Sequence, residues 1–307
     1  MARFIIIRLL QAVVTLIGIS ILIFVMARAS GDPTMLMVSS TATPEEIANI
    51  RHHLGLDKSW PEQYQIFITD LVQGDLGDSL TRKRPVTEMI GEALPNTISL
   101  GLSSFALSML LAVALGVLAA TRRDSFWDNG VKFIAVLGQA LPGFWVAIMA
   151  VFVFSVSWEL LPPAGTGTPA HFVLPVATMA FFLLPGMMRL VRSGMLDVLD
   201  SEYIKLSRIK GLPERTVIWK HALRNALIAP LTVAGMIFAL LITGTLVVEN
   251  VFNWPGIGRL LINALTGRDF PIIQGVTLMV AVVVLGVNLF VDIMYAYIDP
   301  RIRYQRM

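Results

Sequence analysis

The sequence predicts an all-α, polytopic membrane protein, and three observations predict this class. Of the 307 residues, 55% are hydrophobic and only 15% are charged, with a mean hydropathy of +0.72. This composition lies outside the range of ordinary soluble domains. Six apolar segments approach the roughly 20 residues that a helix needs to cross the hydrocarbon core. Lys and Arg gather in alternate short loops, as expected for a chain that crosses a bilayer repeatedly.

The six expected transmembrane helices are Phe4–Met26, Thr97–Ala120, Val131–Trp158, Phe172–Met188, Pro230–Val248 and Ile272–Tyr297. The loops after the second and fourth of them, and the C-terminal tail, are the basic ones. Because short basic loops stay on the cytoplasmic side, we expect both termini to be cytoplasmic and residues 31–96 to lie outside. The cluster Arg82-Lys83-Arg84 fits this topology, since loops longer than about 60 residues escape the charge rule.

Residues 1–30 are expected to form a retained first span. Their apolar run, Leu9–Ala27, is too long for the core of a signal peptide and has no convincing small-residue cleavage site.

Residues 31–96 are expected to form a small helical cap on the outer membrane face. Thr43 and Pro44 have the pattern of a helix N-terminus, and that helix should run to about Leu54. A second helix should open at Pro61, with Trp60, Tyr64 and Phe67 at helical spacing, and end at Gly74, Gly77 and Asp78.

Residues 97–307 should hold the remaining five helices, two of which contain a proline-glycine pair. Pro142 lies within the third expected span and Pro185 within the fourth. Each is either an ordinary kink satisfied by neighbouring helices or a gating break along a translocation route.

Several kinds of chemistry are excluded. Cysteine is absent, and the four histidines, His52, His53, His171 and His221, lie in loops without metal-ligand spacing, so we expect no catalytic residue, no metal and no cofactor. There is no phosphate-binding loop of the G-x-x-x-x-G-K-[ST] type, so ATP would have to be hydrolysed by another subunit. The basic residues lie at span ends, where lipid headgroups and orientation explain them, so we expect no nucleic-acid partner.

Charged residues of the expected spans lie near their ends: Arg8, Lys132, Glu159, Glu249 and Asp292. Ion-driven transporters usually carry titratable groups at membrane depth. An ion-coupled secondary transporter or channel therefore remains as the less favoured alternative, and an intramembrane enzyme lacks a catalytic pair.

The most informative segment is polar and runs from Arg192 to Arg224, with seven Lys/Arg and four acidic residues. It is long enough for two short helices bent at Gly211. In the second, which starts near Pro213, a 100° helical wheel puts Ile218, Trp219, Ala222, Leu223, Ala226 and Leu227 on one face. Val217 falls on the opposite, polar face, and Leu212 is exposed at the bend. This pattern suits either docking into a partner's groove or an interfacial helix that re-enters the bilayer.

The chain resembles the permease subunits of binding-protein-dependent ABC importers. The motifs are Glu202-Tyr203-Ile204-Lys205, Lys210-Gly211-Leu212, Glu214-Arg215 and His221-Ala222-Leu223-Arg224-Asn225-Ala226, which are similar to the EAA loop, here at about 192–229. The run around Trp254-Pro255-Gly256 and several shorter motifs resemble the dipeptide, oligopeptide and nickel group, B-type subunit. Leu206-Ser207 stands where the general signature has two alanines, so this pair carries no expected contact.

The resemblance implies a type I ABC importer permease architecture that works by alternating access in the bacterial plasma (inner) membrane. Its implied partners are a second homologous permease subunit, two cytoplasmic ATP-binding subunits and an extracytoplasmic substrate-binding protein. Gly211 would be the bend, and Leu212, Pro213, Arg215 and Val217 the ATPase contacts. Trp254, Pro255 and Gly256 would form a structured outer re-entrant turn near the docking face, or else a rigid turn with no substrate contact. Peptides are the expected substrate, with nickel chelates, opines or sugars as alternatives.

Overall fold

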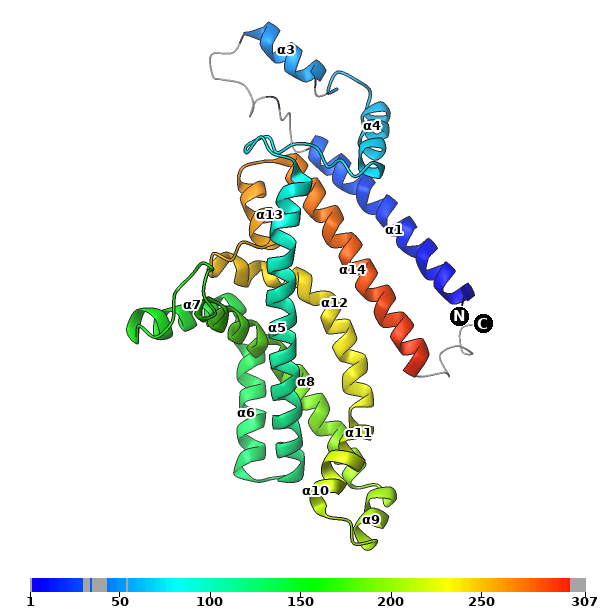
Figure 1. Ribbon diagram of the computed structural model, residues 1–307, viewed down its shortest axis with the longest axis vertical. Coiled ribbons are helices and arrows are strands. Elements are labelled where there is room, and N and C mark those ends of the chain that lie inside the picture. The colour runs from blue at the N-terminus through cyan, green and yellow to red at the C-terminus, as the bar shows by residue number, and fades with distance from the viewer. Residues whose placement is uncertain (1, 30–33, 35–42, 54, 299–307) are drawn as a thin grey trace. The chain divides into compact units, whose positions relative to one another are not determined.

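The computed structural model describes residues 2–29, 34, 43–53 and 55–298 (Figure 1). It contains α1 (Ala2–Ala29), α3 (Pro44–His53), α4 (Trp60–Val72), α5 (Val86–Thr121), α6 (Phe126–Ala140), α7 (Gly143–Val151), the π-helical η1 (Phe152–Ser157), α8 (Ala170–Leu199), α9 (Glu202–Ile209), α10 (Glu214–Thr216), the π-helical η2 (Val217–Ala222), α11 (Leu223–Ala226), α12 (Ile228–Val251), α13 (Ile257–Thr266) and α14 (Phe270–Ile298). The described part of the chain contains no β-sheet, so the predicted all-α class is confirmed.

The predicted membrane crossings are present. Four helices, α1, α5, α8 and α14, are long and apolar enough to span a bilayer. Two bent pairs also qualify, α6 with the α7–η1 helix at 104° and residues 214–226 with the first part of α12 at 53°. Among the described residues this gives up to six spans when each bent pair counts as one, as the six apolar segments predicted.

The chain folds into two compact units. The first comprises Met1–Thr97 with Pro255–Ala296, and the second comprises Ile98–Trp254. The division at residues 30 and 96 expected from the sequence concerns membrane topology and stays a prediction.

In the first unit, the two helices expected between residues 31 and 96 are present. A reciprocal pair of hydrogen bonds between Thr43 and Glu46 caps α3, the backbone N–H of each residue reaching the other's side chain at 2.8 and 3.3 Å. The predicted end at Leu54 lies outside the described residues. On α4, Tyr64 and Phe67 pack against Phe24 of α1, with ring centroids 5.4 and 5.9 Å apart. The aromatic face of α4 therefore packs against the first transmembrane helix.

A second cluster in this unit joins the start of α5 to α13 and α14. It comprises Val86, Met89, Ile90, Ala93, Ile257, Leu260, Ala264, Ile272 and Val276, all buried. This core holds α13 against the start of α5.

In the second unit, α8 packs closely against its neighbours at four glycines. A Cβ at Gly116 of α5 would lie 2.8 Å from the Cβ of Val191, and one at Gly194 would lie 2.7 Å from the carbonyl oxygen of Ala226. Gly138 of α6 faces the ring of Pro185 in the same way, and Gly143 faces the ring of Phe182. Small residues that allow close backbone approach are the usual means of packing helices in membranes.

The two proline-glycine pairs behave differently. At Pro142 the helix breaks, since α6 ends at Ala140 and α7 begins at Gly143 after the 104° bend. At Pro185 it does not, because α8 continues through both Pro175 and Pro185, and both are buried. Of the two alternatives for Pro185, this continuity favours a proline satisfied by its neighbours: the ring fills the space that Gly138 leaves, and the helix continues.

Gly138→Ala should destabilise the protein, because its new methyl group would overlap the rigid ring of Pro185. Overpacking of this kind costs about 1–3 kcal/mol. The matched control is Gly130→Ala on the same helix, where no atom lies within 4 Å of the added Cβ. Alanine is the better helix former, so the control should be neutral or stabilising. Thermal unfolding in detergent measures both, and equal midpoints would show that α6 and α8 are not in tight contact.

Candidate functional site

The polar segment forms an elbow, residues 200–227, that connects α8 to α12 (Figure 1). Its first helix, α9, ends in a Schellman motif: the N–H of Gly211 donates to the carbonyl of Arg208 at 2.9 Å, and that of Leu212 donates to Ser207 at 3.4 Å. Gly211 has φ of +76°, a conformation that other residues adopt only with strain. The bend expected at Gly211 is confirmed.

The second helix of the elbow starts after Pro213 and contains η2, whose hydrogen bonds run from residue i to i+5. This repeat alters the helical wheel. Val217 is 0% exposed and packs with Ile204, Ala222 and Met195 in a cluster that also includes α5 and α8. The predicted exposed position of Val217 is wrong, because a wheel of 100° per residue does not describe a π-helical turn.

The outer face of the elbow, meaning the surface that is not packed against the rest of its own unit, is exposed and partly apolar. Leu212, Pro213 and Arg215 are exposed, as expected. Sequence reasoning missed Leu206 and Ile209 on α9, and Ile209 is 82% exposed. Their i, i+3 spacing on a short helix was the available signal.

A hydrogen bond braces the two halves of the elbow against each other. The Tyr203 hydroxyl on α9 and Nδ1 of His221 on η2 lie 2.6 Å apart. Arg208 and Glu214 form a further pair at 2.7 Å across the bend, but both are substantially exposed, so this pair contributes little. The bend is fixed mainly by the backbone geometry of Gly211 and by the buried inner face.

An ion cluster that sequence reasoning missed connects α6 to α8. Asp128 is 0% exposed and accepts two hydrogen bonds from Arg192, at 2.6 and 2.9 Å from Nε and Nη2. Lys132 lies 2.8 Å from the same carboxylate, and the N–H of Asp124 donates to it at 3.0 Å. The i, i+4 spacing of Asp128 and Lys132 is visible in the sequence, but the contact with Arg192 spans 64 residues.

The turn at residues 254–256 is rigid on its Trp254 side. Trp254 is 1% exposed, belongs to the core of the second unit and meets Phe172 edge-on with ring centroids 4.5 Å apart. Its N–H donates to the carbonyl of Glu249 at 2.8 Å. Of the two alternatives for this turn, this geometry supports a structural role for Trp254.

In the first unit, the turn continues into α13 through Pro255 and Gly256. The Nδ2 of Asn96 donates to the carbonyl of Pro255 at 3.0 Å, and the N–H of Ile257 donates to Oγ1 of Thr97 at 2.8 Å. Both bonds tie the start of α13 to α5.

The other end of α13 is held by Asp269, which is 1% exposed. Its carboxylate accepts the hydroxyls of Ser79 and Thr81 at 2.6 and 2.7 Å, and the N–H groups of Leu80 and Thr81 at 3.2 and 3.0 Å. Burial by itself raises the pKa of Asp269, but the hydrogen bonds from Ser79, Thr81 and Leu80 outweigh it and hold that pKa below its usual value.

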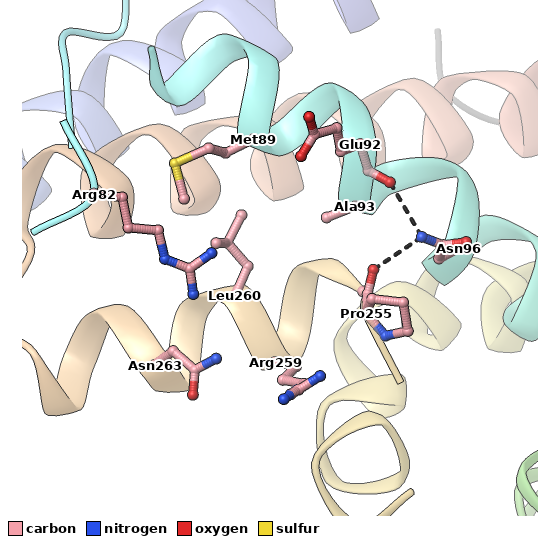
Figure 2. A pocket seen from close by; sticks show the side chains of 10 residues that line it. Arg82, Met89, Glu92, Ala93, Asn96, Pro255, Arg259, Leu260 and Asn263 are labelled. Carbon is pink, nitrogen blue, oxygen red and sulfur yellow. Dashed lines mark hydrogen bonds between the residues drawn. The ribbon is translucent and has the colours of Figure 1, made fainter. Parts of the chain in front are cut away.

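Between these two attachments lies a cavity of about 410 Å³ (Figure 2). It is lined by Arg82, Met89, Glu92, Ala93, Asn96, Pro255, Gly256, Arg259, Leu260 and Asn263. In Figure 2 the side chain of Arg82 extends into it from the turn before α5, beside Leu260 and above Asn263 of α13. No group of three or more metal-ligating side chains occurs in the described residues.

These features define a class of protein: a multi-pass membrane subunit with a rigid polar elbow. The comparisons identify the family. The sequence-family model for the binding-protein-dependent transport system inner membrane component matches residues 112–304. The family model for the N-terminal part of this component matches residues 1–101. The chain belongs to this family and is the membrane component of such a transport system.

Relatives match over almost the whole chain. A putative peptide transport system permease protein of Brucella abortus (strain 2308) is 41% identical over 306 residues, covering 97% of this chain and 98% of the relative. An oligopeptide transport system permease protein of Bacillus subtilis (strain 168) is 39% identical over 316 residues, covering 99% and 100%. A glutathione transport system permease protein of Pectobacterium atrosepticum is 38% identical over 306 residues, covering 99% and 100%.

Solved structures share the fold at low identity. The structure of a methionine ABC transporter in inward-facing conformations matches with a TM-score of 0.58 and 15% identity, covering 69% of this chain and 96% of that chain. An amino acid ABC transporter matches with a TM-score of 0.54 and 14% identity, covering 68% and 93%. The predicted architecture of a type I ABC importer permease is therefore confirmed.

Asp269→Asn should destabilise the first unit and make its stability depend less on pH in the acid range. Asparagine offers one acceptor oxygen to donors that now share a carboxylate, and each charged hydrogen bond contributes about 1.5–3 kcal/mol. Because the folded pKa of Asp269 is depressed, its contribution is full above the unfolded value of about 3.9 and is lost as pH falls through the folded pKa.

Thermal unfolding between neutral pH and pH 3 measures this effect, and Asp78→Asn, an exposed carboxylate of the same segment, is the control. An acid-dependent loss that is as large in Asp269→Asn as in the wild type would contradict the assignment.

Proposed function

We propose that this chain is one of two permease subunits of an ATP-driven importer of dipeptides or oligopeptides that works by alternating access. The names of the three relatives, which concern peptide, oligopeptide and glutathione transport, support this substrate class. Two cytoplasmic ATP-binding subunits would hydrolyse ATP, and an extracytoplasmic binding protein would deliver the peptide. The chain would lie in the bacterial inner membrane with both termini in the cytoplasm.

The observation that carries the proposal is the exposed outer face of the elbow. Leu206 is 54% and Ile209 82% exposed, and both lie among charged side chains of α9. Apolar side chains framed by charges suit the groove of a soluble partner. Leu212, Pro213 and Arg215 extend this face around the bend. Val217, which is buried in its own subunit, leaves the set of contact residues.

The experiment is uptake by the complete complex reconstituted in proteoliposomes, with labelled dipeptides and oligopeptides as substrates. Uptake should require ATP and resist a protonophore, because the expected spans carry no charged residue at mid-depth. Uptake that survives ATP depletion and collapses with the protonophore would contradict the proposal. Uptake of a nickel chelate, an opine or a sugar, with no uptake of peptides, would show that peptides are not the substrate.

Ile209→Asp should detach the ATP-binding subunits without unfolding the permease. Its side chain is exposed, so the change costs little in folding, but it puts an uncompensated charge at the interface. Recovery of the ATP-binding subunits on co-purification should fall about tenfold or more.

Val217→Asp is the contrasting variant, because it buries a carboxylate and should lower the thermal unfolding midpoint of the permease itself. Undiminished recovery of the ATP-binding subunits with Ile209→Asp would remove Ile209 from the contact.

Gly211→Val should uncouple ATP hydrolysis from uptake, whereas Gly211→Asn should retain much of the coupling. No atom lies within 4 Å of an added Cβ at this position, so the effect comes from backbone strain at φ +76°. That strain is about 1–2 kcal/mol for most residues and smaller for asparagine. The ratio of peptide taken up to ATP hydrolysed measures the coupling, and a wild-type ratio in Gly211→Val would show that the bend does not matter.

A further inference from the structure

The cavity beside α13 has the anatomy of a receptor for a protruding side chain. Its floor, made by Met89, Ala93 and Leu260, is buried, whereas Arg82 and Asn263 on its rim are exposed. A buried apolar centre with an exposed polar rim is typical of a protein–protein interface. Small-molecule pockets instead enclose most of the ligand's surface.

The walls of this cavity are fixed before any ligand binds. Asp269 anchors residues 79–81, which immediately precede Arg82, through four hydrogen bonds. Asn96 and Thr97 fix the start of α13 at the opposite end. The buried cluster under the floor joins α5 to α13. A preorganised site loses little conformational entropy on binding.

The cavity is electropositive. Arg82 contributes a positive charge, and Glu92 is the only carboxylate among the lining residues. Glu92 is already engaged by Arg84, 2.6 Å away. Within the described residues, no hydrogen bond or ion pair involves the guanidinium of Arg82, which lies in the cavity (Figure 2). A guanidinium that has no partner in the described part of its own chain is free to bind a carboxylate in a bidentate manner.

We propose that this cavity receives an acidic side chain, Asp or Glu, from the extracytoplasmic binding protein. The inference rests on the proposed function, which puts residues 31–96 and 249–271 on the outer side of the membrane. It adds the residues and the chemistry of the contact: Arg82 binds the carboxylate and Met89, Ala93 and Leu260 contact the aliphatic part of the side chain. The dependence of the family on a binding protein supplies the partner.

The test measures the affinity of the complete transporter complex in lipid nanodiscs for the purified binding protein of the same transport system. Arg82→Glu should weaken binding about tenfold or more, and Arg82→Gln should weaken it less. Lys83→Glu is the matched control, because it makes the same charge change at the next residue but does not line the cavity. It should change the affinity less than about threefold, since charges outside the contact are screened by salt. Equal effects of Arg82→Glu and Lys83→Glu, or none, would overturn the proposal.

Cross-linking locates the partner. The chain has no cysteine, so Asn263→Cys gives a single thiol in this subunit at the rim, which can carry a benzophenone maleimide. The expected product joins this chain to the binding protein and disappears when Arg82→Glu is added. If a free dipeptide protects this thiol from labelling in the absence of binding protein, the cavity is a substrate site and the proposal is wrong.

The two proposals fail differently. If wild-type complexes take up peptide with ATP but Arg82→Glu binds the binding protein normally, only the assignment of the cavity is wrong. If the wild type shows no ATP-driven uptake, the proposed function fails, and the assignment of the cavity fails with it.

Discussion

The second unit depends on the close packing of α8 against its neighbours. Gly116 and Gly138 have no side chain at the points where Val191 and Pro185 approach them, and Gly194 has none where the carbonyl oxygen of Ala226 approaches. Such contacts do not slide, because moving either helix would bring backbone against a side chain that has no space to yield. The helix therefore connects the elbow at its C-terminal end with the α6–α7 bend as one rigid element. This rigidity is what a membrane subunit needs in order to pass on a movement imposed at its elbow.

The ion cluster at Asp128 adds a polar restraint to this packing. A buried carboxylate with no partner would be very costly, but this one receives Arg192, Lys132 and a backbone N–H. Asp128 also lies in the first turn of α6, where the helix dipole favours a negative charge. Removing Arg192, which donates two hydrogen bonds to it, would break a buried ion pair, and such a loss costs about 3–5 kcal/mol. The cluster thus fixes the register of α6 against α8 where the polar segment begins.

Local chemistry could be predicted from the sequence and long-range pairing could not. Thr43, Pro142 and Gly211 each act through their own backbone or a residue a few positions away, and the caps and bends expected there are present. Asp269 accepts hydrogen bonds from residues 188–190 positions earlier in the chain, so no local sequence pattern predicts that it anchors them. The burial of Val217 was missed for a different reason, since a sequence does not show where an α-helix widens into a π-helical turn.

The π-helical turn also explains how the elbow can serve two sides at once. It turns Val217 and Ala222 inward together, onto the cluster that includes Val191 and Met195 of α8. The apolar residues of the elbow are thereby divided between two surfaces: one locked into the subunit and one, around Ile209, left exposed. A force applied to the exposed surface cannot be absorbed by rotation of the second helix, because its buried face has no free volume beside Gly194. In the proposed coupling to ATP-binding subunits, such a force would pass to α8, and the inner face would then be as necessary as the outer one.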